Sequence, residues 1–245
     1  MKSLIVIPAR MGSSRFPGKP LKKINGKPMI KIIYDNLKKN KKIIDIVIAT
    51  CDIEILKFCQ NNEMKVIMTS KKHNRATDRT AEAVLKYEKK NKIKIDIVVM
   101  VQGDEPMVDN NMIVAAIKPF KFNNKINVIN LISKIKDKRN FIDKNCIKVI
   151  KNKNNEALYF SRMPIPSQNN KLIYGYKQVC IIPFRRNFLF KYLKMKETIL
   201  EKIESIDMLR ILENSFKVNL VEIKKNTYPV DTLKDLKRVS NLMKV

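Results

Sequence analysis

The sequence has few of the residues that carry nucleophilic or metal chemistry. Among its 245 residues there are one histidine, four cysteines and no tryptophan. With His73 as the sole imidazole, a Ser-His-Asp hydrolase would need His73 as its base, and no GxSxG nucleophile motif accompanies it. The cysteines form no CxxC pair and no zinc-like spacing. We interpret them as buried apolar residues rather than metal ligands or disulfide partners: Cys51, Cys59, Cys146 and Cys180.

Long hydrophobic runs are also missing. No apolar stretch approaches the roughly 20 residues that a membrane-spanning helix needs. The run from Leu4 to Ile7 is too short for the apolar region of a signal peptide, and Pro8 and Arg10 follow it at once. We therefore expect a soluble, cytoplasmic protein that does not bind membranes. Its length fits one large domain, or one domain with a smaller lobe.

Acidic residues are scarce relative to basic ones. The chain has 23 Asp and Glu against 51 Lys and Arg, a formal net charge of +28. Such an excess is typical of proteins that bind nucleic acid, and a basic nucleic-acid-binding α/β protein is one alternative. However, the lysines lie throughout the chain among asparagine and isoleucine, as in "FNNKINVINLISKIKDKRN", and no nucleic-acid-binding motif accompanies them. We favour a composition bias that gives a solvated basic surface, and expect no nucleic-acid partner.

Arginine is the scarce basic residue, with ten of the 51 positions. A guanidinium group binds phosphate or carboxylate through two parallel hydrogen bonds, so an arginine kept in a lysine-biased chain indicates anion recognition. Five arginines lie in loop-like segments within two residues of a glycine, proline, serine or threonine: Arg10, Arg15, Arg75, Arg79 and Arg162.

Short β-branched runs alternate with longer amphipathic segments in the first hundred residues. This order predicts βαβ units and an α/β fold with a mostly parallel sheet. The near-continuous apolar character of the runs is typical of strands that are buried on both faces. The predicted strands are residues 3–9, 44–50, 64–70 and 95–102, and the predicted helices are residues 27–39, 51–62 and 77–90.

After Val108 the alternation loosens, which predicts a mixed sheet. We expect one domain over residues 1–245 with a mixed-sheet lobe inserted around residues 120–190. The predicted strands are residues 126–135, 146–152, 176–184 and 216–223, and a further strand begins at residue 157 and runs into a loop rich in proline and asparagine that reaches residue 170. The predicted helices are residues 185–194, 201–215 and 232–243. In such sheets ligands bind at the carboxyl ends of the strands.

The loop after the first strand, within "IPARMGSSRFPGKPL", has the composition of a phosphate-binding loop. Its glycines allow close backbone approach, and Arg10, Arg15 and Lys19 supply positive charge. It is not a Walker A loop, because Gly12 is too far from Gly18 and proline replaces the Ser/Thr that binds magnesium. It is not a Rossmann GxGxxG loop either. A basic surface loop remains the alternative.

Two further segments present carboxylates next to predicted strands or helices. In "VVMVQGDEPMV" a strand delivers Gln102 and Asp104 to its carboxyl end. Magnesium is usually held by one or two carboxylates together with substrate phosphates, so Asp104 is a candidate ligand. The alternative is that Asp104 and Glu105 only cap a helix after Pro106. In "NTYPVDTLKDL", Asp231 by itself is expected to cap a helix, and it is functional only as a second metal carboxylate.

Together, the segments "IPARMGSSRFPGKPL", "INGKPMI", "VQGDEPM", "ALYFSR" and "VDTLKDL" resemble the CMP-Kdo synthetases, or 3-deoxy-manno-octulosonate cytidylyltransferases. The resemblance covers nearly the whole chain. It implies a Rossmann-like nucleotidyltransferase fold and a reaction in which CTP and a 3-deoxy-ulosonic acid give the CMP-sugar and pyrophosphate, with Mg²⁺ as cofactor. It also implies a homodimer, a product used in lipopolysaccharide or other cell-surface polysaccharide, and a role in sugar binding and dimerisation for the lobe around residues 120–190.

The resemblance assigns roles to residues at matching positions. The triphosphate would be bound by Arg10, Arg15 and Lys19, and the rest of the nucleotide by Pro8, Ala9, Thr77, Arg79 and Gln102. Magnesium would be held by Asp104 and Asp231. The sugar would be contacted by Arg15, Gln102, Arg162, Gln178 and Asp207. The anomeric hydroxyl of the sugar is unusually acidic and a metal lowers its pKa further, so no histidine base is needed.

The sequence departs from the family mainly on the sugar side. A "HLGIYGY"-like strand matches "KQVCIIPFRRNFL" better than the nearby "IYGY", because a basic helix start follows the family strand. In that register Gln178 replaces a histidine, Cys180 a glycine and Ile182 a tyrosine. Asp207 and Met208 replace a Glu-Gln pair, and Arg75-Ala76 a Ser-Gly pair. We therefore expect Kdo or a close relative as acceptor; a nine-carbon sialic-type acid and a catalytically inactive homologue remain alternatives.

Overall fold

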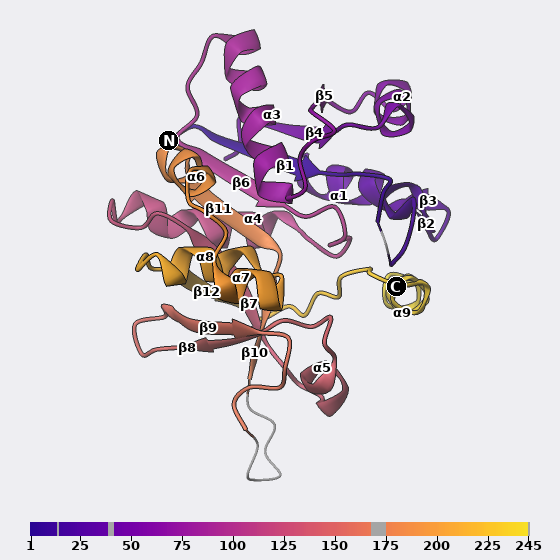
Figure 1. Cartoon of the computed structure of the whole chain (residues 1–245). Helices are drawn as coiled ribbons and strands as arrows, with labels where there is room; N and C mark the ends of the chain where they lie inside the picture. The colour runs from indigo at the N-terminus through magenta and orange to yellow at the C-terminus, as the bar shows by residue number, and fades with distance from the viewer. Residues whose placement is uncertain (14, 39–41, 168–174, 245) are drawn as a thin grey trace. The chain divides into compact units, whose positions relative to one another are not determined.

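A computed structural model describes residues 1–13, 15–38, 42–167 and 175–244. The chain forms two compact units (Figure 1). The first comprises Met1–Val114 and Thr227–Val245, and the second comprises Ala115–Asn226. The carboxyl-terminal segment therefore belongs to the unit that the amino-terminal half builds.

The first unit contains a parallel sheet. Its strands lie in the order β6 (Ile97–Val101), β1 (Ser3–Pro8), β4 (Asp45–Thr50) and β5 (Val66–Met68), and every pairing among them is parallel. All residues of β1 and β6 are buried, which explains their unbroken apolar sequence. The prediction of a parallel α/β sheet is confirmed.

Helices pack around this sheet. The predicted ones are α1 (Met29–Leu37), α2 (Ile53–Asn61), α3 (Ala76–Asn91) and α9 (Leu233–Leu242). Helix α3 packs against all four strands, and small buried residues such as Ala81 and Ala83 allow this close approach (Figure 1). Helix α4 (Asn110–Ile117), which spans the boundary between the units in the sequence, was expected only in the alternative that places a helix after Pro106. The short elements are η1 (Lys19–Leu21), β2 (Lys23–Ile24) and β3 (Lys27–Pro28).

The second unit contains a mixed sheet. Its strands lie in the order β12 (Asn219–Ile223), β7 (Ile129–Lys134), β10 (Tyr176–Val179), β8 (Lys148–Lys151) and β9 (Ala157–Ser161). Strand β12 is parallel to β7, and the remaining pairs are antiparallel, as predicted for a mixed sheet. The other elements of this unit are η2 (Lys118–Lys121), α5 (Lys138–Ile142), β11 (Ile181–Arg185), α6 (Arg186–Leu193), α7 (Ile199–Glu204) and α8 (Asp207–Glu213).

Two elements predicted as continuous are interrupted in the structure. The predicted strand 176–184 forms two strands, β10 and β11, which are separated by Cys180. The predicted helix 201–215 forms α7 and α8, because Ser205 adopts a left-handed conformation with φ 53°. The buried carboxylate of Glu201 on α7 accepts two hydrogen bonds of 2.6 Å from the Arg210 guanidinium on α8 and fastens the two helices together.

The basic helix start that was used to choose the sugar-side register is present in the structure, while the register itself stays a prediction. Strand β11 ends at Arg185 and α6 begins at Arg186, so a basic helix start follows the strand directly. The competing "IYGY" match begins at residues 173 and 174, which lie outside the described residues.

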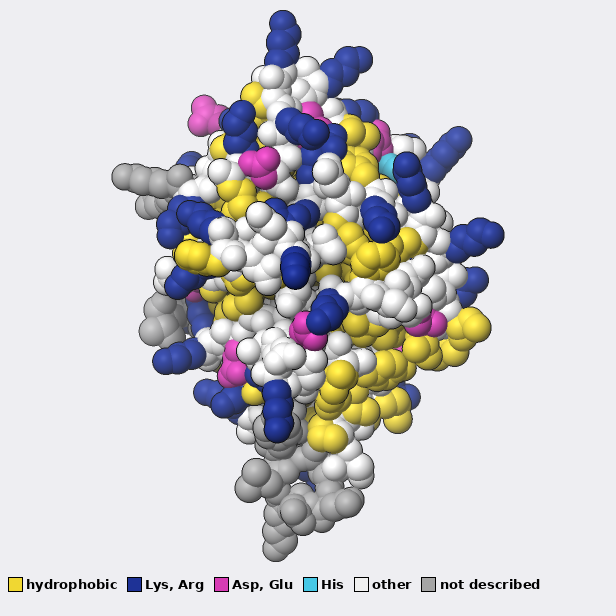
Figure 2. All heavy atoms as spheres, turned by 90° about the vertical axis from the view of Figure 1, so that its left-hand side faces the viewer, with side chains coloured by type: hydrophobic (Ala, Val, Ile, Leu, Met, Phe, Trp, Pro, Cys, Tyr) yellow, Lys and Arg dark blue, Asp and Glu magenta, His cyan; other side chains and the backbone are white. Residues whose placement is uncertain are grey.

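The described helices and the charge on one face of the molecule bear on the expectations drawn from composition. None of the helices in the described ranges is both long and apolar enough to cross a membrane. Figure 2 shows Lys and Arg side chains distributed over one face, with Asp and Glu side chains between them. On that face the described basic residues are dispersed, in keeping with a general composition bias.

Candidate active site

The loop that follows β1 is held in a compact conformation by its own backbone and by Asp52. The Met11 N–H donates to Asp52 Oδ2 at 2.8 Å, although Asp52 stands at the N-cap position of α2. The Met11 carbonyl accepts hydrogen bonds from the N–H groups of Ser13 and Gly18, both at 2.9 Å. Gly18 has φ 70°, a left-handed conformation that glycine adopts without strain. The loop therefore folds back and places Lys19 at the start of η1.

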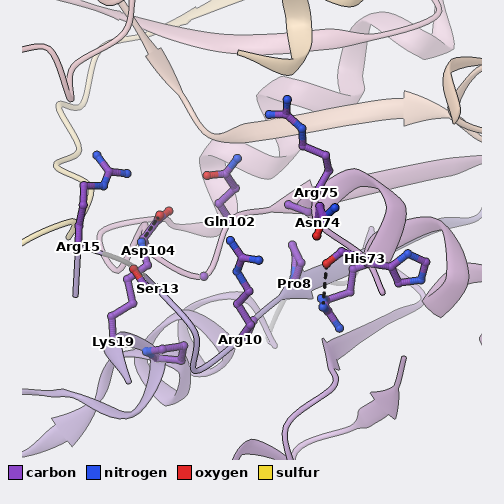
Figure 3. A pocket seen from close by; sticks show the side chains of 15 residues that line it. Pro8, Arg10, Ser13, Arg15, Lys19, His73, Asn74, Arg75, Gln102 and Asp104 are labelled. Atoms are coloured by element: carbon purple, nitrogen blue, oxygen red, sulfur yellow. Dashed lines mark hydrogen bonds and ion pairs between the residues drawn. The ribbon is translucent and has the colours of Figure 1, made fainter. Parts of the chain in front are cut away.

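A cavity of about 240 Å³ lies in the first unit beside this loop (Figure 3). Its walls come from the end of β1, the opening loop, residues 73–79 and the segment after β6. Eight of the residues assigned by resemblance line it: Pro8, Ala9, Arg10, Arg15, Lys19, Arg79, Gln102 and Asp104. The structure thus brings together most of the predicted nucleotide-binding residues.

Lys19 joins the two candidate metal carboxylates. Its Nζ lies 2.7 Å from Asp104 Oδ2 and 3.1 Å from Asp231 Oδ1. Arg15 Nη2 also lies 3.1 Å from Asp231 Oδ1. A backbone hydrogen bond of 2.9 Å from Val230 N–H to the Asp104 carbonyl holds the two chain segments side by side. Two carboxylates that are far apart in the sequence therefore meet at one cationic group.

The electrostatics of this cluster keep Lys19 positively charged and leave one carboxylate oxygen without a hydrogen bond from a described residue. Burial lowers the pKa of Lys19, but attraction to Asp104 and Asp231 and hydrogen bonds from Lys19 to both carboxylates outweigh it, so the pKa is raised. Asp104 Oδ1 is buried and accepts no hydrogen bond from any described residue. This acceptor is an oxygen of the kind that Mg²⁺ prefers.

The donor set fits a metal that is shared with a ligand. Within the described ranges, no group of three or more His, Cys, Asp or Glu side chains could hold a metal ion. Magnesium commonly takes one or two protein carboxylates and completes its coordination with substrate phosphates and water. Asp104 and Asp231 match that pattern.

The alternative of helix capping does not explain either carboxylate. Thr232 is the N-cap residue of α9, and its side chain accepts a hydrogen bond from Asp235 N–H. Helix α4 begins at Asn110 rather than directly after Pro106, and Asp109 Oδ1 accepts a hydrogen bond from Met112 N–H at 3.1 Å. The two helix starts are thus capped by other residues, and Asp104 and Asp231 are available for another role.

Close backbone packing fixes the segment that carries Asp104. A Cβ atom on Gly103 would lie 3.1 Å from the Pro8 carbonyl oxygen, tighter than most contacts of real Cβ atoms. Glycine at this position lets the segment after β6 approach the end of β1.

Arg10 and Gln102 lie in the middle of the cavity (Figure 3). Arg10 is exposed, and its guanidinium donates to no acceptor among the described residues. Gln102 is half-buried, and its side-chain amide likewise has no described partner. Both groups are therefore free to bind a ligand.

The loop before α3 forms the wall at the other end of the cavity. Arg79 is 3% exposed, and its Nη1 donates to Thr69 Oγ1 at 2.5 Å while its Nη2 donates to the His73 carbonyl at 3.5 Å. Thr77 is fully buried in the first turn of α3 and does not line the cavity. His73 and Asn74 do line it, although sequence reasoning did not place them in the site; their position inside "HNRATDR" was the available signal.

The predicted sugar-binding residues of the second unit lie in different surroundings. Arg162 Nε donates to the Glu204 carbonyl at 2.7 Å, and its Nη1 donates to the Lys144 carbonyl at 3.1 Å. Gln178 Nε2 donates to Asn130 Oδ1 at 2.6 Å. Asp207 is half-buried in the first turn of α8. Their roles toward a sugar stay predictions.

Comparisons with known proteins show the family to which the chain is similar. A family model described as Cytidylyltransferase matches residues 4–224. The 3-deoxy-manno-octulosonate cytidylyltransferase of Fusobacterium nucleatum subsp. nucleatum is 38% identical over 246 residues, covering 100% of this chain and 98% of that protein. That of Thermodesulfovibrio yellowstonii is 39% identical over 245 residues, covering 96% of each chain.

Solved structures extend the comparison to the fold. A CMP:2-keto-3-deoxy-manno-octonic acid synthetase, complexed with CTP, superimposes with a TM-score of 0.88 at 34% identity and covers 99% of this chain and 98% of its own. A 4-diphosphocytidyl-2C-methyl-D-erythritol synthase from Anaerococcus prevotii has a TM-score of 0.65 at 15% identity, a likeness of fold alone. Because relatives match the chain over its full length both in sequence and in structure, the chain belongs to the 3-deoxy-manno-octulosonate cytidylyltransferase family of nucleotidyltransferases.

Proposed function

We propose that this protein transfers the CMP group of CTP to 3-deoxy-manno-octulosonate (Kdo) and releases pyrophosphate. The observation that carries the proposal is the meeting of Asp104 and Asp231 at Lys19, beside a cavity that Lys19 and Asp104 line together with Arg10 and Arg15. The full-length relatives with this activity in their names support the same reaction.

The cationic end of the cavity suits the triphosphate. Transfer of a nucleotidyl group to an alcohol depends on positioning and charge neutralisation rather than on a covalent intermediate. Arg10 has no acceptor among the described residues, so its guanidinium is ready to bind a phosphate. Lys19 and Arg15 supply further positive charge. These three side chains would orient the α-phosphate for attack.

Asp104 and Asp231 would hold Mg²⁺. The bound ion supplies charge neutralisation at the phosphates and lowers the pKa of the attacking hydroxyl. Lys19 would then leave the carboxylates and pair with phosphate oxygens, so that each charge of the cluster keeps a partner. Gln102 would hydrogen-bond a hydroxyl of the ligand with its amide. His73 Nε2 already lies 2.5 Å from Glu82 Oε2, so the chain's one histidine is engaged away from the phosphates.

The relatives favour Kdo itself as the acceptor over a modified ulosonic acid. Replacement of the family's tyrosine by Ile182 nevertheless argues for measuring the preference, because loss of a hydrogen-bonding partner changes selectivity steeply. We assign sugar binding and dimerisation to the second unit, through the lobe around residues 120–190. A homodimer and a product destined for cell-surface polysaccharide complete the proposal; light scattering tests the former.

The decisive experiment is an acceptor panel. Purified protein is incubated with CTP, Mg²⁺ and either Kdo, an amino-substituted Kdo or a nine-carbon sialic-type acid, and pyrophosphate release is measured. We expect release to be fastest with Kdo and to stop without Mg²⁺. Release with none of the acids would overturn the enzymatic proposal, and faster turnover of another acid would overturn the choice of Kdo. Salt-dependent binding of DNA or RNA with no turnover would favour the nucleic-acid alternative.

A further inference from the structure

The wall of the cavity formed by residues 70–75 has no regular secondary structure. It follows β5 and precedes α3, and His73, Asn74 and Arg75 from it line the cavity. Figure 3 shows these residues at the end of the cavity opposite Lys19 and Asp104. Because the phosphates belong at the cationic Lys19 end, the nucleoside half of the ligand belongs beside this wall.

Two charged side chains from α3 hold this wall in place. Arg79 donates to Thr69 Oγ1, to the Ser70 carbonyl and to the His73 carbonyl. Glu82 lies three residues further along the helix, on the same face. Its Oε2 accepts hydrogen bonds from Ser70 N–H at 2.8 Å and lies 2.5 Å from His73 Nε2. Hydrogen bonds from α3 therefore hold the loop both at its start, Ser70, and in its middle, His73.

Glu82 is also tied to the strand that precedes the loop. Its Oε1 lies 2.8 Å from Lys86 Nζ, and Lys86 Nζ donates to the Met68 carbonyl at the end of β5 at 2.7 Å. Burial raises the pKa of Glu82, but hydrogen bonds from Lys86, Ser70 N–H and His73 outweigh it and lower the pKa to about 2. The carboxylate is thus negatively charged under working conditions and accepts all three hydrogen bonds at once.

We infer that Glu82 is a positioning residue for nucleotide binding, which shapes the 70–75 wall through Ser70 and His73 without lining the cavity itself. The inference rests on the proposed function, since it assigns the nucleoside of CTP to this wall. A neutral glutamine at position 82 keeps the size of the side chain but removes the charge and one of the two acceptors, so Ser70, His73 and Lys86 can no longer all be satisfied.

The test compares Glu82→Gln with a matched control, Asp35→Asn. Asp35 pairs with Lys31 at i,i+4 on α1 at 3.0 Å, so the control also removes one helical carboxylate from an ion pair but does not contact the wall. For each protein, calorimetry measures CTP binding, steady-state kinetics gives kcat and the two KM values, and hydrogen exchange follows the amides of residues 70–75.

We expect the Glu82→Gln protein to bind CTP about tenfold more weakly and to show a KM for CTP raised by about the same factor. Its kcat and its KM for Kdo should stay within about twofold of the unaltered protein, because the triphosphate end is untouched. Amides 70–75 should exchange faster, while the rest of α3 keeps its protection. The Asp35→Asn protein should match the unaltered protein in all of these.

The inference is overturned if amides 70–75 exchange faster but CTP affinity is unchanged. It is also overturned if the exchange of these amides is unchanged, or if kcat falls by the same factor as CTP affinity. If Glu82→Gln does not fold, His73→Gln is the second variant. It replaces the half-buried imidazole that contacts the Glu82 carboxylate, and it should also weaken CTP binding. Failure of the proposed function is visible separately, because the unaltered protein would then bind no CTP. In that case the exchange rates alone decide whether Glu82 holds the wall.

Discussion

Replacing Lys19 by methionine removes the cation that Asp104 and Asp231 share while keeping an apolar side chain of similar length. The side chains of Lys19, Asp104 and Asp231 are only 16%, 15% and 11% exposed. Water therefore solvates the two carboxylates poorly once Lys19 is removed. Removing one partner of a buried ion pair costs about 3–5 kcal/mol. Arg15 still contacts Asp231, and the site is partly open, so we expect the lower end, about 3 kcal/mol. For a chain of this size that loss lowers Tm by about 6–12 °C.

Magnesium should restore part of this stability. With Lys19 gone, the two carboxylates are free to bind Mg²⁺ without nucleotide, and Mg²⁺ at ten times its Kd adds about 1.4 kcal/mol. This corresponds to a rise in Tm of about 3–6 °C. In the unaltered protein Lys19 competes for the same oxygens, so Mg²⁺ alone should change Tm little.

Thermal unfolding followed by circular dichroism, in EDTA and in Mg²⁺, measures both effects. The control is Lys31→Met, which removes the i,i+4 partner of Asp35. The side chains of Lys31 and Asp35 are 27% and 37% exposed. Such surface pairs contribute less than about 1 kcal/mol, and no Mg²⁺ response is expected there. The reasoning is refuted if Lys19→Met is as stable as the unaltered protein, or if Mg²⁺ does not raise its Tm.

Three further predictions concern single side chains. Asp104→Asn and Asp231→Asn should each lower turnover at least about a hundredfold with little loss of fold, measured as pyrophosphate release and Tm; full activity of Asp231→Asn would remove it from the metal site. Thr232→Ala should cost about 1 kcal/mol in denaturant unfolding by removing the N-cap of α9, with turnover unchanged; a larger effect on turnover than on stability would contradict this. The folded-state pKa of Glu82, about 2, is below its ordinary value of 4.5, so its stabilisation is present above pH 4.5 and is lost as the pH falls toward 2. The stability difference between the unaltered protein and Glu82→Gln should shrink over that range in acid-unfolding curves.

The parallel sheet was predictable because its strands are buried on both faces and therefore read as apolar runs. Interruptions inside longer patterns were not predictable in the same way. The apolar periodicity continues through Ser205, and only the left-handed backbone and the Glu201–Arg210 pair reveal two helices. Helix α4 entered only as an alternative and without bounds, because its sequence, "NNMIVAAI", is short and apolar, and a buried helix of that length cannot be told from a strand by periodicity.

In the candidate site, local sequence patterns likewise indicated some of the residues, and others came only from the resemblance or the tertiary structure. Loop composition pointed to Arg10, Arg15 and Lys19, but Asp231 lies 212 positions from Lys19, and no local pattern links them. Asp231 alone looked like a helix cap, and the resemblance to a family was needed to suggest more. Arg79 was assigned to the nucleotide by the resemblance, and this role stays a prediction. The structure adds that Arg79 lines the cavity and that its guanidinium is hydrogen-bonded to Thr69, Ser70 and His73. The burial of this charged side chain is a tertiary property that no local pattern reveals.

The sugar side shows most clearly what a sequence leaves undetermined. Gln178 can present either an acceptor or a donor, and its neighbour Asn130 selects between them. Asn130 is buried, and its Nδ2 donates to the Leu131 carbonyl at 2.6 Å and to the Val179 carbonyl at 3.1 Å. Asn130 Oδ1 must then accept from Gln178 Nε2, which leaves Gln178 Oε1 as the end that does not face Asn130. The prediction that Gln178 contacts the acceptor sugar then specifies Oε1, a neutral acceptor that suits a hydroxyl or an amino group equally well.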